Sequence, residues 1–266
     1  MAIDYVIDYD CVPKQTLSSQ GILERLKKRE RAETIIRIYR ENGDDRPPSR
    51  MGFDFTRTTP EGEEETETIV VQDLLDEVAD LDPVAHHCTG CPANRRGVPF
   101  GCTGFVQYPI SGKAEAWLLD QLPPVNEPLV WLLLKQGVEN FSYDGRMFAQ
   151  LRHGSDTYFE DDQAAFRFLG EFSLNANQVF DMIFNVGDIA PNHGAVLLLF
   201  FNAIERSELQ ADAIMKLAPA NLEKIQAHMF LHQTMPKDDR TIIEMKDFFQ
   251  AVWVAWALNV QLKIDA

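Results

Sequence analysis

The sequence lacks any hydrophobic run long enough to cross a membrane. Its longest uninterrupted apolar stretch runs from Ala251 to Leu258, far short of the roughly 18 residues that a spanning helix needs. The first ten residues, MAIDYVIDYD, carry acidic residues where a secretory signal would carry basic ones. We therefore expect a soluble, cytoplasmic protein that does not associate with membranes.

Basic residues are scarce. The chain has 25 Lys and Arg against 41 Asp and Glu, which gives a formal net charge of -16. An acidic protein repels nucleic acid and anionic lipid unless it carries a local basic patch. The expected partner is therefore a small molecule or another protein, which the sequence does not identify.

Sequence motifs that are typical of common enzyme classes are also missing. The sequence contains no dinucleotide-binding Gly-x-Gly-x-x-Gly, no Gly-x-Ser-x-Gly and no EF-hand loop. Ser111-Gly112-Lys113 resembles the end of a phosphate loop, but the preceding glycine is not at the required spacing. The sequence therefore leaves open whether the protein is an enzyme.

What is present is ordinary globular composition, with 266 residues, 45% of them hydrophobic and 25% charged. This length suits one large domain or two modest ones. The pattern predicts an α+β fold, with a small α/β part over residues 1–140 and a mainly helical part over 141–266. No Gly/Ser-rich or Pro-rich linker separates these parts, so we expect them to pack as one unit.

The N-terminal elements follow from local patterns. Alternation of Ile3, Tyr5 and Ile7 with aspartates predicts a half-buried strand, with Cys11 at the end of its inward face. Helix-period residues closed by Asn42-Gly43 predict a helix from about residue 18 to 41. Strand-like runs at 51–59 and 66–71 suggest a hairpin, and a short helix is expected near 71–81, ending before Pro83.

The remaining chain is expected to be mostly helical. Ser111 should cap a helix reaching Leu122, and Pro128 should open another reaching about Lys135. Two weak strand signals lie at 146–152 and 157–160. Further helices are predicted near 176–186, 192–206, 208–217, 219–234 and 239–258.

The most informative segment is the cysteine-rich loop, HHCTGCPANRRGVPFGCTGF. It holds Cys88, Cys91 and Cys102 among glycines that let the backbone wrap closely and aim amides at sulfur. A Cys-x-x-Cys turn lets two thiolates converge on one ion. Cys11 could supply a fourth ligand from the end of the first strand. These four cysteines are the predicted metal ligands.

The sequence leaves three interpretations of this site open. A [4Fe–4S] cluster suits one Cys-x-x-Cys pair with two separated cysteines, and Pro92 after Cys91 is typical of ferredoxin-like runs. A structural zinc site with four cysteine ligands is the alternative, although zinc ribbons normally have two such pairs. Thiols without metal are the third. If Cys11 is simply a core residue, His86 or His87 could complete a zinc site. In an iron–sulfur cluster, the fourth iron could then be open to substrate.

Arg95 and Arg96 lie beside the Cys-x-x-Cys pair and make this loop locally basic. One hypothesis is that they tune a cluster or contact an anionic partner. The simpler one is that they compensate the charge of the thiolates and point into solvent.

The histidines give a weaker signal. His228 and His232 share a face if their segment is helical, which suits a packed pair better than a metal site. His193 lies near a predicted helix start, where the dipole disfavours imidazolium and where Asp188 or Asn192 could cap the helix. A further hypothesis is an enzyme that uses these histidines in the helical half.

Overall fold

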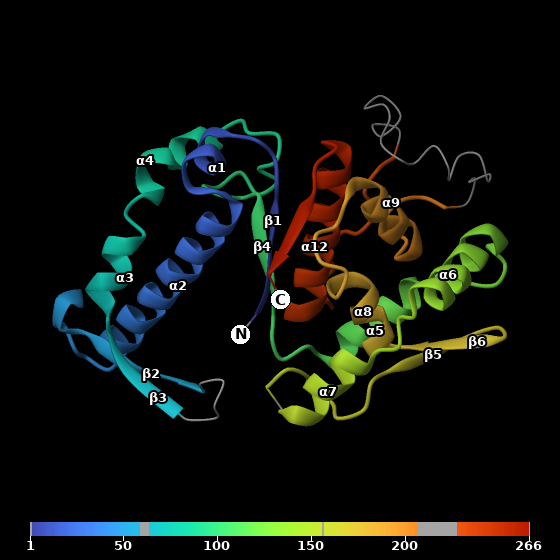
Figure 1. The fold of residues 1–266 in the computed structure, drawn as a ribbon, viewed down its shortest axis with the longest axis horizontal. Coiled ribbons are helices and arrows are strands. Elements are labelled where there is room, and N and C mark those ends of the chain that lie inside the picture. The colour runs from blue at the N-terminus through green and yellow to red at the C-terminus, as the bar shows by residue number, and fades with distance from the viewer. Residues whose placement is uncertain (1, 59–63, 156, 207–227, 266) are drawn as a thin grey trace. The chain divides into compact units, whose positions relative to one another are not determined.

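The computed structural model describes residues 2–58, 64–155, 157–206 and 228–265 (Figure 1). Its strands are β1 Ala2–Ile7, β2 Gly52–Thr58, β3 Glu64–Val70, β4 Thr103–Gln107, β5 Phe166–Leu169, β6 Phe172–Asn175 and β7 Leu262–Asp265. Its α-helices are α1 Val12–Leu17, α2 Ser19–Glu41, α3 Val71–Glu77, α4 Leu81–Ala85, α5 Gly112–Gln121, α6 Pro128–Phe141, α7 Arg146–Gly154, α8 Ala176–Phe184, α9 Pro191–Phe200 and α12 Arg240–Ala257. Short 3-10 helices span Pro48–Arg50 and His86–Cys88. The predicted α+β class, with a helix-rich C-terminal half, is confirmed.

The chain divides into two compact units. Unit 1 comprises Met1–Tyr9, Pro92–Arg96 and Gly101–Ala266, and unit 2 comprises Asp10–Cys91 and Gly97–Phe100. The predicted division at residue 140 falls inside unit 1, within α6. The predicted helix over 208–217 lies outside the described residues, as does the part up to residue 227 of the helix predicted over 219–234.

Unit 1 is built around a three-stranded sheet in the order β4-β1-β7, with both pairings antiparallel. Strand β1 is central, and Ile3, Tyr5, Val6 and Ile7 are fully buried. It is therefore covered on both faces towards its end, instead of on one face as alternation predicts. The strand ends at Ile7, so Cys11 is not part of it and precedes α1.

Helix α12 packs against β1 and β4 within unit 1. Phe248 and Phe249 of this helix are fully buried, and Phe248 meets the ring of Tyr5 edge-on at 5.2 Å between centroids. Asp239 accepts the Ile242 N–H at the start of α12, and the Ser111 hydroxyl donates to Asp239 at 2.8 Å. Since Ser111 also accepts the Ala114 N–H, one hydrogen bond joins the caps of α5 and α12.

Residues 146–152 form part of helix α7, so the strand predicted there is wrong. Phe148 and Arg152 are both buried and lie four residues apart, which places them on one helix face. At 157–160 the structure has only a bridge between Phe159 and Ile110. The β5–β6 hairpin follows, and Leu169 accepts a hydrogen bond from the indole N–H of Trp131 in α6 at 3.0 Å.

Unit 2 centres on the long helix α2, which begins at its Ser18 cap and ends at Asn42 before left-handed Gly43. The predicted β2–β3 hairpin is confirmed. The predicted single helix over 71–81 is two helices, and Pro83 lies in the first turn of α4, where its missing N–H is tolerated.

Opposite charges align along α2. Arg25 pairs with Asp80, Lys28 with Glu77, and Arg29 with Asp82. The basic stretch of α2 therefore faces the acidic segment that follows β3. All three basic side chains remain partly exposed, so each pair contributes at most about 1 kcal/mol and mainly orients the helices.

A buried ion pair joins α5 and α7. Arg152 and Glu115 side chains are each 1% exposed and lie 2.5 Å apart, and Arg152 also donates to Asn177 and to the Asp161 carbonyl. Its guanidinium lies 3.9 Å from the centroid of the Phe159 ring. Each of the three guanidinium nitrogens thus donates a hydrogen bond, while the group also lies over the Phe159 ring.

Replacing Arg152 with Met should lower the free energy of unfolding by about 3–5 kcal/mol, because Glu115 would be left buried without its partner. Urea unfolding followed by circular dichroism measures the change. Arg146→Met is the control: this side chain is 84% exposed and pairs with Asp144, so its loss should cost less than about 1 kcal/mol. Equal losses in the two variants would contradict the assigned role of the buried pair.

Candidate metal centre

The Cys-x-x-Cys segment forms a tight turn at the end of α4. The chain continues from α4 into the 3-10 helix His86–Cys88, and the Cys91 N–H donates to the Cys88 carbonyl at 3.3 Å. Gly90 lies between the two cysteines with φ 73°, a conformation that a side chain would disfavour. The local sequence therefore produces the reversal expected of a metal-binding turn.

Cys88 is buried in an apolar cluster of unit 2. Its neighbours include Ile22, Leu81 and Phe100. Phe100 adopts the left-handed conformation, with φ 57°, and its N–H donates to the Cys88 sulfur at 3.2 Å. Such a bond stabilises sulfur as a thiolate, and it is the type of bond that tunes metal–sulfur sites.

Cys11 lies near the Cys-x-x-Cys turn within unit 2, because α1 packs against α4 and the 3-10 helix. Burial raises the pKa of the Cys11 thiol, the Lys14 backbone and charge lower it, and the neighbouring Cys91 and Cys88 raise it further. The carbonyl of Cys11 accepts the Gln15 N–H, so its backbone is fixed by the start of α1. Cys11 thus lies close enough to Cys88 and Cys91 for their charge to act on its thiol.

Cys102 belongs to unit 1. It is buried, and its carbonyl accepts the Ile7 N–H at 3.0 Å, directly before β4. None of the four cysteines, all of which are described, forms a disulfide. Over the described ranges, no three His, Cys, Asp or Glu side chains converge as ligands of one ion. The donor set of a metal site is present, but these side chains are not arranged around a common point.

His86 and His87 are exposed, and their rings lie 3.9 Å apart between centroids. Among the described residues, neither histidine forms a group of three possible metal ligands with the cysteines. Their role as alternative zinc ligands stays a prediction.

Arg95 does not point into solvent. Its side chain is 1% exposed and pairs with Asp247 of α12, while it also donates to the Tyr5 hydroxyl and the Thr103 carbonyl. Burial raises the pKa of Tyr5 well above its usual value. Arg96 is exposed overall, and its guanidinium donates to the same Thr103 carbonyl at 2.6 Å. Both arginines thus hold the backbone next to Cys102, within unit 1.

The nearby Gly104 is needed for this arrangement. A Cβ at this position would collide with the hydroxyl of Tyr5 and with the Arg95 guanidinium. Gly104 therefore leaves room for the side chains of Tyr5 and Arg95. The sequence had instead predicted that it lets the backbone wrap around a cysteine sulfur. Asp247 was not anticipated, because no local pattern links it to a residue 152 positions earlier.

The histidines of the C-terminal half do not form a site together. Residues 228–235 are not helical, so the predicted shared face of His228 and His232 is wrong. The His232 Nε2–H donates to the Phe201 carbonyl at 2.8 Å, and its ring contacts Trp117 and Phe249. His228 accepts the Trp253 indole N–H with its carbonyl. These contacts give both residues a packing role.

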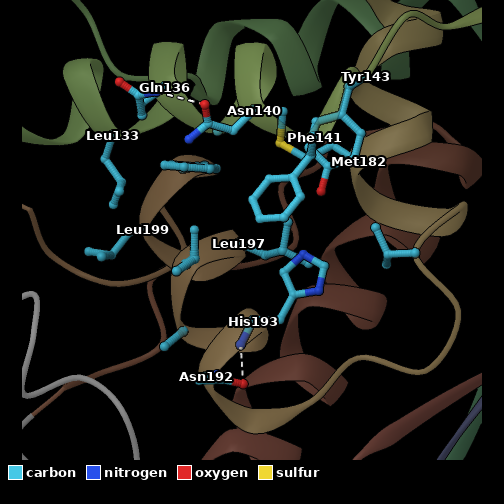
Figure 2. Close-up of a pocket in the computed structure, with 15 residues that line it drawn as sticks. Leu133, Gln136, Asn140, Phe141, Tyr143, Met182, Asn192, His193, Leu197 and Leu199 are labelled. Carbon is cyan, nitrogen blue, oxygen red and sulfur yellow. Dashed lines mark hydrogen bonds between the residues drawn. The ribbon is translucent and has the colours of Figure 1, made fainter.

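His193 lies in the first turn of α9, but neither Asp188 nor Asn192 caps this helix. The cap is Ala190, with Pro191 as the first helical residue, so the N-terminus is set by proline geometry. Burial lowers the pKa of His193. Its ring faces a cavity in unit 1 (Figure 2).

Comparisons with known proteins add no family to this description: no family model, curated protein or solved structure matches the chain. Among the described helices, none is long and apolar enough to cross a membrane.

Acid should destabilise the protein through His232. Burial lowers its pKa to about 4, below the value of about 6.5 expected when unfolded. As pH falls, His232 therefore takes up a proton in the unfolded state before it does so in the folded state. The contribution of the neutral His232 to the free energy of unfolding is lost as pH falls from about 6.5 towards 4. Between about pH 7.5 and 5 the stability of the wild type should fall by about 2 kcal/mol more than that of His232→Leu. Urea unfolding at both pH values measures this difference, and parallel losses would contradict it.

Proposed function

We propose that this protein binds a [4Fe–4S] cluster through Cys11, Cys88, Cys91 and Cys102, and that the cluster serves electron transfer, sensing or substrate activation. The observation that carries the proposal is the neighbourhood of Cys11, Cys88 and Cys91 in unit 2, with the Phe100 N–H directed at the Cys88 sulfur. A thiolate set with amide hydrogen bonds is the donor chemistry that such clusters require.

Cys102 is assigned as the fourth ligand from chain connectivity. It follows Phe100 by two residues, and the Phe100 N–H is bound to Cys88. Two residues span at most about 7 Å. The covalent chain therefore limits how far Cys102 can lie from the Cys-x-x-Cys turn, without any assumption about how the two units are placed.

Binding would require the thiols to converge. Cys91 lies in a turn and Cys11 at a helix start, and both are half-buried, so their side chains have room to reorient. Metal binding and local folding are commonly coupled in this way. When bound, the cluster would supply one-electron chemistry, while Cys88 would anchor it to the core and Phe100 would donate to the ligand sulfur.

A structural zinc site with the same four cysteine ligands is the second candidate, and the burial of Cys88 favours it. Cys88 packs with Val78, Leu81 and Val84. A zinc ion bound to Cys88 would therefore link the Cys-x-x-Cys turn to this apolar cluster. In that case the metal would shape the loop of a binding or adaptor module. Both candidates imply a reducing compartment such as the cytosol, because the thiols must remain unoxidised.

Protein purified without oxygen should be brown, with a broad visible absorption band and about four iron atoms per chain. Cys91→Ser is the sharpest variant, because Cys91 is half-exposed and its loss should spare the apolar core. It should reduce bound iron and visible absorbance at least several-fold. Metal analysis and absorbance spectroscopy measure both.

Thr89→Ala is the matched control, since Thr89 is exposed in the same turn and offers no thiolate. It should retain wild-type iron and colour. Colourless protein with one zinc per chain would replace the cluster with the structural site. Purified protein with neither metal would overturn both candidates.

A further inference from the structure

Unit 1 contains a cavity of about 750 Å³ between α6, α8 and α9 (Figure 2). This volume lies within the range of about 300–1,000 Å³ typical of small-molecule sites. Leu133 and Phe141 come from α6, Met182 from α8, and Val196 and Leu199 from α9. The cavity is thus formed by helices whose own packing places apolar side chains around an open space.

The walls are mostly apolar and carry no formal charge. No Asp, Glu, Lys or Arg lines the cavity in the part of the chain that the structure describes. Gln136 donates to Asn140 at 2.8 Å, and the Asn192 side chain accepts the His193 N–H, so these amides already bind neighbours (Figure 2). A charged ligand would lose its hydration here without gaining a counter-charge.

His193 is the polar group best placed to meet a ligand. Its ring points from α9 into the cavity, towards the ring of Phe141 (Figure 2). Within the described residues, no hydrogen-bond partner of the ring is present. Because burial lowers its pKa, the imidazole is neutral near pH 7 and can both donate and accept a hydrogen bond.

Gly137 keeps part of the cavity open. It lies inside α6, where glycine costs about 1 kcal/mol relative to alanine. A Cβ here would come only within 3.9 Å of Phe200, which also lines the cavity. A side chain introduced at position 137 would therefore begin in open space beside Phe200, without a close contact at its Cβ.

We propose that this cavity binds a neutral, largely apolar small molecule whose single hydroxyl or carbonyl group meets the His193 ring. The size, the uncharged apolar walls and the one available imidazole together select this chemical class. The site lies wholly in unit 1 and does not depend on the cysteines or on a metal.

The test uses N-phenyl-1-naphthylamine, a neutral dye that fluoresces in apolar sites, on the full chain. Its emission should rise on binding, and decan-1-ol should displace it. Decanoate, which has the same chain length but is ionised at about pH 8, should displace it about tenfold more weakly, because its charge has no partner in the cavity.

Gly137→Leu should weaken dye binding about tenfold by filling the cavity, whereas the matched Gly154→Leu should not change it. Gly154 ends α7, and no described residue lies within 4 Å of a Cβ placed there. His193→Leu should retain dye binding but weaken decan-1-ol several-fold, since only the hydrogen bond is lost. Circular dichroism verifies that each variant is folded.

Three results would overturn the proposal. The first is a wild type that does not raise the dye emission. The second is a Gly137→Leu protein that is folded and binds the dye as the wild type does. The third is decanoate that competes as strongly as decan-1-ol, which would exclude the neutral ligand class.

Discussion

The antiparallel pairing of β1 with both β4 and β7 is the constraint on which unit 1 depends. It joins the first and the last described segments of the chain to the strand that follows the cysteine-rich loop. Helix α12 can cover this sheet because Tyr5 and Phe248 pack edge-on, and because the Arg95 guanidinium neutralises Asp247. Burying that guanidinium is tolerable because its two terminal nitrogens donate to Asp247, the Tyr5 hydroxyl and the Thr103 carbonyl, while its Nε–H meets no acceptor among the described residues. The backbone that carries Cys102 is thus held by the same interactions that hold the sheet.

Unit 2 follows a different principle, in which charge orients the helices and two apolar clusters stabilise them. The basic face of α2 meets the acidic segment around α3 and α4, which offsets part of the local excess of negative charge. Cys88 belongs to one apolar cluster and Met51 to the other. Because Cys88 contributes to packing and also accepts a backbone N–H, its structural role and its proposed role as a metal ligand are separate properties. Metal content and stability therefore have to be measured separately.

The two proposals rest on different chemistry and on different residues. The cysteines offer soft, polarisable donors in a turn shaped by Gly90 and Phe100. The cavity offers apolar walls and a neutral imidazole, which suits an uncharged organic molecule. Because neither site supplies a residue to the other, loss of one function in a variant does not imply loss of the second. The ion pair of Arg152 and the half-buried His232 support the helical part of unit 1 without entering either site.

Local patterns in the sequence were sufficient to predict the α+β class, the β2–β3 hairpin, the Ser111 cap and the termini of α2. Each of these features depends on residues within a few positions of one another. The sequence also predicts that the four cysteines are metal ligands, which stays a prediction. Only the tertiary structure showed that Arg95 is held by Asp247, that Gly104 admits Tyr5, and that 146–152 is a helix with Arg152 buried against Glu115. It also showed that His228 and His232 do not share a helix, and it placed His193 at an apolar cavity. These features arise from contacts between residues tens to hundreds of positions apart, where burial and pairing outweigh local preference and leave no periodic signal in the sequence.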